Sequence, residues 1–371
     1  MTRLYTINSA WEPDKPIEGY SSLIWTERFS DMGDFEINAP YNETLLENLD
    51  LETNLQYVGS DKIMIVEQIE EYKYGRGAPT LKFMGRSKER ILDDRIVPLL
   101  VDTNDIVVTY AGRPDVVVMT IVNNYCDRDI LTPDSNNGDV AHSYPNFTSV
   151  NATGGVGSSK TWQIQPGSLY ERVKEICAAN NMGFKIQHLA GAAGLNFRLY
   201  VGEDRTINAV NPSDNTNAVK FGPKYDNFSE IRFVRTSKDR KSAVRVQTAV
   251  PSGDTIAEFP APTYGGWVGT ATGYSRREAY LAASDIKARA AESIWGPRGE
   301  RYLGQHNKNI KLIDGKVKAD DGKYVYGIDY NLGDKVLLMY DRGIQLSSRV
   351  TEFIWAEDAN GSTRYPTLEE V

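Results

Sequence analysis

The sequence has few of the residues that disulfide frameworks and metal sites require. Its 371 residues include only two cysteines, Cys126 and Cys177, and three histidines, His142, His188 and His306. The cysteines form no Cys-x-x-Cys pair, which argues against a disulfide framework and a structural zinc site. The histidines are far apart and no His-Glu-x-x-His is present, so the pattern of a zinc peptidase is missing. We therefore expect no metal and no other cofactor.

Long hydrophobic runs and basic blocks are missing as well. No apolar run approaches the roughly 18 to 20 residues of a membrane-spanning helix, so we expect no stable membrane association. The first residues show no secretory pattern, which predicts synthesis in a host cytoplasm. The 50 acidic and 42 basic residues give a net charge of -8, which argues against tight binding to phosphate backbones. Ordinary composition and this length predict two to four compact units.

The sequence contains no complete catalytic motif. The segment 154–161 is one residue short of a Walker A motif, has Ser159 where a glycine is required, and precedes no helix, so a surface loop is the better interpretation. Cys177 lies on the apolar stripe of an expected helix, and Cys126 has no identifiable base. Adjacent acids such as Glu70 and Glu71 are expected by chance among so many carboxylates, and on a strand they point to opposite faces. The sequence does not predict an enzyme.

What is present is mainly β-strand pattern. In residues 20–40 two strand-like runs flank a tight turn at 31–34, which predicts a β-hairpin. Further strands are expected at 63–66 and 81–85. A short helix at 41–49 is predicted between them, because Leu45, Leu46 and Leu49 fall on one helical face.

The middle of the chain predicts an α/β unit with a long loop at 132–161. Ser168 and Glu171 have the spacing of a capping box and precede an apolar stripe, so they predict a helix that Gly183 would end. Strands are expected at 184–187 and 197–200.

The last third predicts a second hairpin within 228–250 and then an Ala-rich helix. That helix would begin with Ser275 and Glu278 as a capping box and would stop before Gly296 and Pro297, and its stripe would comprise Ala279, Ala283, Ile286, Ala290 and Ile294. Strands follow at 324–330, 335–340 and 344–355.

Three blocks of sequence resemble the siphophage baseplate hub or tail-tip family, which includes minor tail proteins and the hub region of tail-associated lysins. The blocks lie at 23–40, 85–96 and 330–336, so they extend over nearly the whole chain. The residues that carry the resemblance, here called the signature residues, are Trp25, Gly33, Phe35, Pro40, Gly85, Leu92, Arg95, Leu332, Gly333 and Asp334.

The resemblance implies a mixed β and α+β fold with two tail-tube-like β-barrels and inserted α/β domains. The first barrel would occupy 1–96, and an inserted α/β domain would occupy 97–215. The second barrel would be split between 216–250 and 320–358, around an insert at 251–319 that carries the Ala-rich helix. Residues 359–371 would form a C-terminal tail, and no wall-degrading domain is expected after it.

The implied function is structural. A homotrimeric hub at the virion tail tip would present six barrels to the sixfold tail tube and form a channel for DNA, which it would contact only in transit. The implied partners are the distal tail or tail tube ring, the tape measure protein and other tail-tip or fibre proteins. Two alternatives remain open, a tail-associated enzyme that degrades cell walls and a module that binds glycans or receptors.

Overall fold

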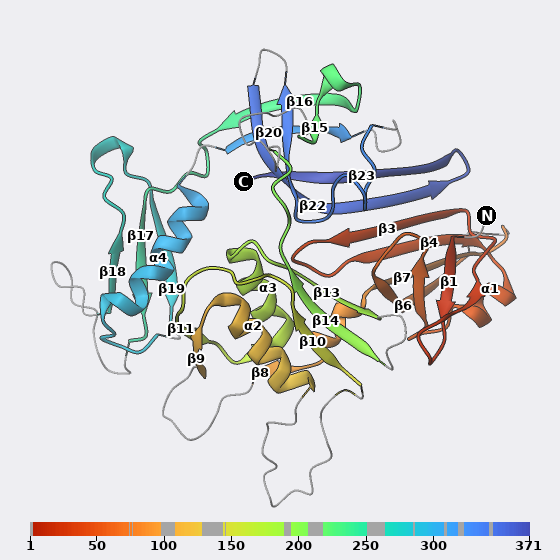
Figure 1. The fold of residues 1–371 in the computed structure, drawn as a ribbon, viewed down its shortest axis with the longest axis horizontal. Helices are drawn as coiled ribbons and strands as arrows, with labels where there is room; N and C mark the ends of the chain where they lie inside the picture. The colour runs from red at the N-terminus through yellow and green to blue at the C-terminus, as the bar shows by residue number, and fades with distance from the viewer. Residues whose placement is uncertain are drawn as a thin grey trace, which may run out of the picture.

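The chain folds mainly into β-sheets with a few helices. The structure is a computed structural model that describes residues 3–73, 75, 77–97, 108–127, 144, 146–188, 194–206, 218–250, 264–284, 286–307, 310–317, 323–340 and 344–371. Figure 1 shows a large sheet at the right and top, a central α/β unit below it, and a small lateral unit at the left. The first part of the predicted 132–161 loop lies outside the described residues, and in its second part a strand forms instead, β10 (Thr148–Asn151).

The main sheet has eleven strands drawn from both ends of the chain. Its order is β15-β21-β22-β3-β4-β7-β6-β5-β1-β2, and β23 pairs with the other edge of β22. The strand bounds are β1 Leu4–Ile7, β2 Pro13–Pro16, β3 Ser22–Arg28, β4 Asp34–Pro40, β5 Asn54–Tyr57, β6 Ile63–Tyr72, β7 Thr80–Ser87, β15 Lys220–Phe221, β21 Lys335–Tyr340, β22 Ile344–Asp358 and β23 Gly361–Glu370. The predicted hairpin is confirmed as β3 and β4, and helix α1 (Glu43–Asn48) as the predicted short helix.

Two separate closed barrels are not found among the described strands. β3 pairs with β22 over six residue pairs, from Arg28 opposite Glu352 to Leu23 opposite Glu357. The strands expected in the first barrel and part of those expected in the second therefore form one open sheet over one hydrophobic core. The alternating pattern identified several of these strands, among them β3, β4, β21 and β22, but it carries no information about which edges pair.

One row of residues crosses the centre of the main sheet. Trp355, Trp25, Phe35 and Gly85 lie opposite one another on β22, β3, β4 and β7. The Trp25 and Phe35 rings have centroids 6.1 Å apart. A β-carbon at Gly85 would lie 1.7 Å from the Ile65 carbonyl oxygen and 2.9 Å from the Phe35 ring. This row needs large aromatic residues at one end and no side chain at the other.

The central unit (residues 108–200) packs two helices on a three-stranded sheet with its own core. Helix α3 (Leu169–Ala179) is the predicted helix, and its cap is as expected, since the Glu171 amide donates to Ser168 Oγ at 3.3 Å. The helix ends before Asn180, and Gly183 instead opens a strand. The other elements are β9 Val108–Gly112, α2 Pro114–Val122, the π-helical turn η2 Asn123–Asp127, β10 Thr148–Asn151, β11 Lys160–Ile164, β12 Gly167–Ser168, β13 Gly183–His188 and β14 Leu195–Tyr200. The 3-10 helix η1 (Lys88–Leu92) and β8 (Ile96–Val97) connect it to the main sheet.

The lateral unit corrects two expectations. Its sheet contains β17 (Ala243–Thr248), β18 (Gly265–Val268) and β19 (Glu278–Ala283), with helix α4 (Glu292–His306) on one face (Figure 1). The stretch expected to start the Ala-rich helix is β19, which pairs parallel to β17. The small residues allow either structure, and pairing with a central strand decides in favour of the strand. The predicted stop, Gly296 and Pro297, lies inside α4 one turn after its start, where proline removes only one backbone hydrogen bond.

Three further expectations in the last third were wrong. β16 (Phe228–Thr236) pairs with β20 (Ile310–Val317), so the hairpin predicted within 228–250 does not form. Residues 324–330 form turns around an isolated bridge rather than a strand. The expected tail is strand β23, because the turn at 359–360, in which the Asn360 amide donates to Asp358 Oδ1, lets the chain return along β22. The minor 3-10 helices are η3 Pro223–Tyr225 and η4 Gly273–Ser275.

Candidate functional site

The tip of the β3–β4 hairpin, residues 29–33, joins the main sheet to the central unit. The Phe29 carbonyl accepts a hydrogen bond from the Phe184 amide of β13 at 3.1 Å, and the Phe29 amide donates to the Thr351 carbonyl of β22 at 2.9 Å. The Phe29 ring packs edge-on against Tyr200 of β14, with 5.3 Å between centroids. A single residue of the N-terminal half of the main sheet thus contacts both the C-terminal half of that sheet and the central unit.

Two glycines make room for the Phe29 ring. A β-carbon at Gly183 would lie 2.4 Å from that ring, and one at Gly333 would lie 2.2 Å from it. Gly333 also has a φ of +88°, a conformation that residues with a β-carbon adopt at a cost. The position of Phe29 therefore explains why glycine occupies the turn before β21.

The rest of the hairpin tip is held by polar contacts. Asp31 accepts a hydrogen bond from the Tyr170 hydroxyl and lies 2.7 Å from Lys174 Nζ, so it anchors the tip to helix α3. The Gly33 amide donates to Ser87 Oγ at 2.8 Å, and the Ser87 amide donates to the Gly33 carbonyl at 2.9 Å. Burial opposes ionisation of Asp31, but Lys174 and Tyr170 outweigh it and hold the pKa of this carboxyl below its usual value.

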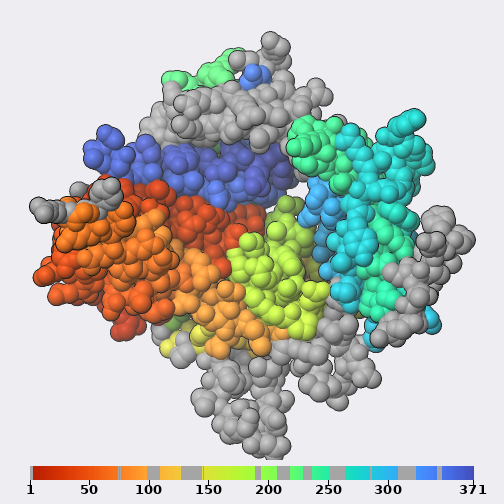
Figure 2. Space-filling view, turned by 180° about the vertical axis from the view of Figure 1, so that it is seen from behind, coloured from red at the N-terminus to blue at the C-terminus, as the bar shows by residue number. Residues whose placement is uncertain are grey.

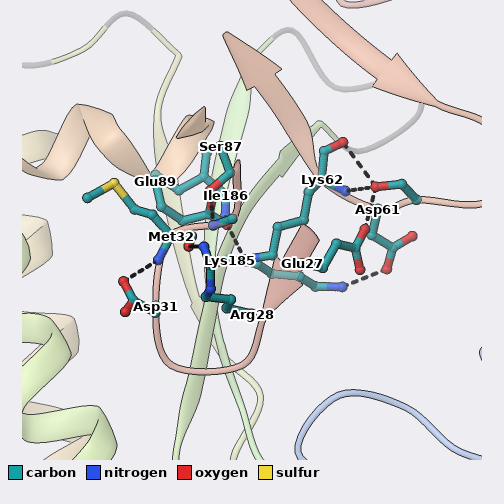
Figure 3. A network of polar contacts seen from close by, with 12 residues as sticks. Glu27, Arg28, Asp31, Met32, Asp61, Lys62, Ser87, Glu89, Lys185 and Ile186 are labelled. Carbon is teal, nitrogen blue, oxygen red and sulfur yellow. Dashed lines mark hydrogen bonds and ion pairs between the residues drawn. The ribbon is translucent and has the colours of Figure 1, made fainter. Parts of the chain in front are cut away.

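A buried ion pair lies beneath the tip (Figure 3). Lys62 Nζ and Glu89 Oε1 are 3.0 Å apart, and their side chains are 2% and 0% exposed. The same Glu89 oxygen accepts the Ile186 amide of β13 at 2.9 Å. Nearby, Lys185 forms a more exposed pair with Asp61 at 2.7 Å. The buried pair therefore joins η1 of the main-sheet side to a strand of the central unit.

Glu27 lies in a second buried group of hydrogen bonds. Trp25 Nε1 donates to Ser60 Oγ at 3.1 Å, and the Ser60 hydroxyl donates to Glu27. The Tyr326 hydroxyl donates to the other Glu27 oxygen at 3.1 Å. Burial raises the pKa of Glu27, although Ser60 and the Lys62 charge act against that rise. These bonds connect the hairpin to the C-terminal region.

Asp334 organises the turn that precedes β21. Its carboxylate accepts the Glu203 amide at 2.6 Å and the Asn331 amide at 2.9 Å, and Arg205 Nε lies 3.3 Å away. The side chain is buried, so these donors compensate for its desolvation. The turn thereby fixes the chain that leaves the central unit after β14 against the main sheet.

Three of the ten signature residues lie in this junction. Gly33, Gly333 and Asp334 lie in it, Leu332 packs in the main-sheet core, and Trp25, Phe35 and Gly85 form the central row. Leu92 is buried in the core of the central unit. Arg95 lies over the Tyr144 ring at 4.0 Å, and its carbonyl accepts the Leu169 amide at the start of α3. Pro40 is exposed at the end of β4 and takes no part in the junction.

Sequence reasoning missed Lys62, Glu89 and Glu27. Nothing in the sequence distinguishes these three charges from the other charged residues, because their burial depends on contacts between distant segments. Lys62 pairs with Glu89 and Lys185 with Asp61, although Glu89 Oε2 has no hydrogen-bond partner among the described residues. Charges that pair across two units in this way suit structural attachment.

The described part of the chain shows none of the metal, thiol or phosphate-binding sites that the sequence was searched for. No group of three or more His, Cys, Asp or Glu residues there could hold a metal ion. Cys126 and Cys177 are buried and form no disulfide, and burial raises the pKa of Cys177. Lys160 of the near-Walker segment opens strand β11 rather than a helix. Among the same residues, no helix combines the length and apolar character needed to cross a membrane.

Comparison with known proteins gives one sequence match and several matches of fold. The profile of the Siphovirus ReqiPepy6 Gp37-like protein family matches residues 2–368. No curated protein matches the sequence. The 43 kDa tail protein of prophage MuSo2 from Shewanella oneidensis is 12% identical with a TM-score of 0.58, over 99% of this chain and 97% of that one. A tail protein from Neisseria meningitidis MC58 is 11% identical with a TM-score of 0.54, over 98% and 96%. At such identities the likeness concerns the fold alone.

Proposed function

The chain belongs to the Siphovirus ReqiPepy6 Gp37-like protein family, and on that basis we propose that it is a structural hub at the tip of a phage tail. In this proposal three copies form a ring that adapts the sixfold tail tube to threefold tip components and leaves a channel for DNA. The observation that carries the proposal is the likeness in fold to two prophage tail proteins over nearly the full length of each chain.

The main sheet gives this proposal a physical form. Its N-terminal half, β1 to β7, and its C-terminal half, β15 with β21 to β23, are joined side by side through β3 and β22. If each half supplies one tube-like lobe, three chains present six lobes, which would match a sixfold ring by symmetry. The junction around Phe29 would keep the two lobes and the central unit in one fixed arrangement, as an adaptor requires.

The edges of the main sheet restrict how neighbouring copies can meet. β2 begins and ends with proline, at Pro13 and Pro16, and β23 contains Pro366. Proline lacks the amide that strand pairing needs, and it is typical of edges that are protected from uncontrolled pairing. We infer that contacts between copies use side-chain faces, to which exposed apolar residues such as Val58 and Tyr72 would contribute. The net charge of -8 would keep DNA from adhering to a channel wall.

The test is the mass and symmetry of the purified full chain. Three copies of the 41.5 kDa chain would give a particle of about 125 kDa. Mass photometry should detect that particle, and electron microscopy should show a threefold ring with six lobes on one face. A monomer at all concentrations, even when the tail tube protein is added, would refute the hub assignment.

The lateral unit favours glycan or receptor binding as a second candidate function. On the sheet face opposite α4, Trp267 and Tyr280 flank Arg245 in one row across three strands, and they are 37% and 66% exposed. The Arg276 guanidinium lies 4.6 Å from the Trp267 ring centre. Exposed aromatic planes beside polar groups suit both sugars and protein partners. Saturable binding of the chain to host cell walls that is lost in Trp267→Ala and Tyr280→Ala variants would support this candidate.

A further inference from the structure

A groove of about 560 Å³ lies between the central unit and the lateral unit. Strand β11 and helix α3 form one wall, and helix α4 forms the other. Figure 2 shows the central unit, in yellow-green, beside the lateral unit, mainly in teal and cyan. The junction described above does not include any residue that lines this groove.

The groove is strongly basic although the whole chain is acidic. Its lining includes four cationic side chains and a single acidic one: Lys160, Arg172, Arg298 and Arg301 against Glu175. Arg172 already pairs with Glu175 at 2.9 Å, and the same acid also acts on the Arg301 charge, so the lining still carries more positive than negative side chains. Such an excess of one sign in a concave site attracts an anionic ligand.

Two of the cations cover a buried tryptophan. Lys160 Nζ lies 4.1 Å and the Arg301 guanidinium 5.7 Å from the Trp162 ring centre, and Trp162 is only 5% exposed. Burial and the neighbouring positive charges lower the pKa of both Lys160 and Arg301. Because the ring is covered, it cannot stack on a nucleotide base, which single-stranded nucleic acids usually require of an aromatic residue. The groove therefore favours carboxylates over a nucleic acid strand.

β11 presents its edge to the groove. Successive side chains of a strand point to opposite faces, so a strand that lined a groove with one face would contribute alternate residues. All five residues of β11, from Lys160 to Ile164, line this groove. Among the described strands β11 pairs only with β9, so its second edge has no strand partner there. An edge of this kind can accept an extended peptide as an added strand.

We propose that the groove binds an extended, acidic peptide segment of a partner protein, which adds to the edge of β11 and directs its carboxylates to Lys160 and Arg301. Aliphatic side chains that alternate with the acids would contact Ile164 and Ile294 on the groove walls. This site concerns a surface apart from the junction, and it does not depend on the ring proposed above.

The test uses the purified full chain and a fluorescein-labelled nine-residue peptide in which Glu and Val alternate. Fluorescence anisotropy at low salt should show saturable binding, because screening is weak there. Matched peptides replace Glu by Gln or carry N-methyl groups on alternate amides. Each should bind at least about tenfold more weakly, because the first lacks charge and the second lacks strand hydrogen bonds.

Two protein variants locate the binding. The variant Lys160→Gln/Arg301→Gln should weaken peptide binding at least about tenfold. The control Lys224→Gln/Lys238→Gln removes the same charge at exposed positions outside the groove, so it should leave peptide binding unchanged. Because the first variant disturbs Trp162, Ile294→Glu serves as a second one, since it adds an acid on an exposed wall position and should also weaken binding.

Three results would overturn the proposal. The first is the absence of saturable binding of the acidic peptide by the wild-type chain. The second is equal weakening in the groove variants and in the control. The third is tighter binding of a ten-nucleotide oligo-dT that the groove variants abolish, which would assign the groove to nucleic acid instead.

Discussion

Removal of Lys62 is the sharpest test of the junction. Its ammonium group is the buried partner of Glu89, and the two atoms lie 3.0 Å apart with almost no exposure to solvent. In the variant Lys62→Met the side chain keeps a similar length and fills a similar volume. The change therefore removes the charge and leaves the packing nearly intact.

The expected loss is large because Glu89 stays where it is. Removing one partner of a buried pair leaves a charge without compensation, and this typically costs about 3 to 5 kcal/mol. A loss of this size is a large share of the roughly 5 to 15 kcal/mol by which folded domains are stable. The double variant Lys62→Met/Glu89→Gln should recover most of it, since neither member of the pair then carries a charge and the Gln oxygen can still accept the Ile186 amide.

Urea unfolding followed by circular dichroism measures these differences in the free energy of unfolding. The matched control is Lys185→Met, which breaks the pair with Asp61 at 2.7 Å. Asp61 is 75% exposed, so this variant should lose about 1 kcal/mol or less. Equal losses of unfolding free energy in Lys62→Met and Lys185→Met would refute the view that the Lys62–Glu89 pair is a solvent-excluded ion pair. A double variant no more stable than Lys62→Met would refute it as well.

Three further predictions concern the space available for a β-carbon at two glycines and the pH dependence of stability. Gly85→Ala should prevent folding or destabilise the protein strongly, because its β-carbon would lie 1.7 Å from the Ile65 carbonyl oxygen. The control Gly304→Ala in α4 places a β-carbon that meets nothing within 4 Å, so it should stabilise the protein by up to about 1 kcal/mol. The thermal unfolding midpoints of the two variants check this prediction. Because the pKa of Glu27 is raised, the stability of the wild type relative to Glu27→Gln should fall as the pH rises above 4.5, the ordinary pKa of a glutamate. Urea titrations at a series of pH values measure this difference, and the absence of such a fall would contradict the prediction. The pKa of Asp31 is shifted in the opposite direction, so the extra stability of the wild type over Asp31→Asn should be fully present above pH 3.8. It should disappear as the pH falls through the lowered pKa, as the same urea titrations would show.

Local patterns predicted the local structure well. The β3–β4 hairpin, helix α1 and helix α3 follow from turn residues, apolar spacing and a capping pair that lie within about ten residues of one another. The rejection of a phosphate-binding loop at 154–161 rested on the same kind of local signal, and Lys160 does open a strand. Physical causes that act over short stretches of chain can be read from short stretches of sequence.

The errors arose where two structures were locally compatible. Residues 278–283 have small side chains that suit a helix, yet they form β19 because β17 offers a partner strand. Strand β23 was missed because its polar and apolar residues alternate only weakly. The two regions expected to close separately instead pair through β3 and β22, and such pairing depends on edges far apart in the sequence.

The sequence by itself determined the β3–β4 hairpin and helices α1 and α3, but not helix α2 or strands β1, β5 and β10, and its resemblance indicated a siphophage tail family before any coordinates. Only the tertiary structure decided that Phe29 fits between Gly183 and Gly333, that Lys62 and Glu89 are buried together, and that β11 presents an edge to a basic groove. The reason is that helix and turn preferences are properties of neighbouring residues, whereas burial, charge pairing and close backbone approach arise from segments that meet only in the folded chain.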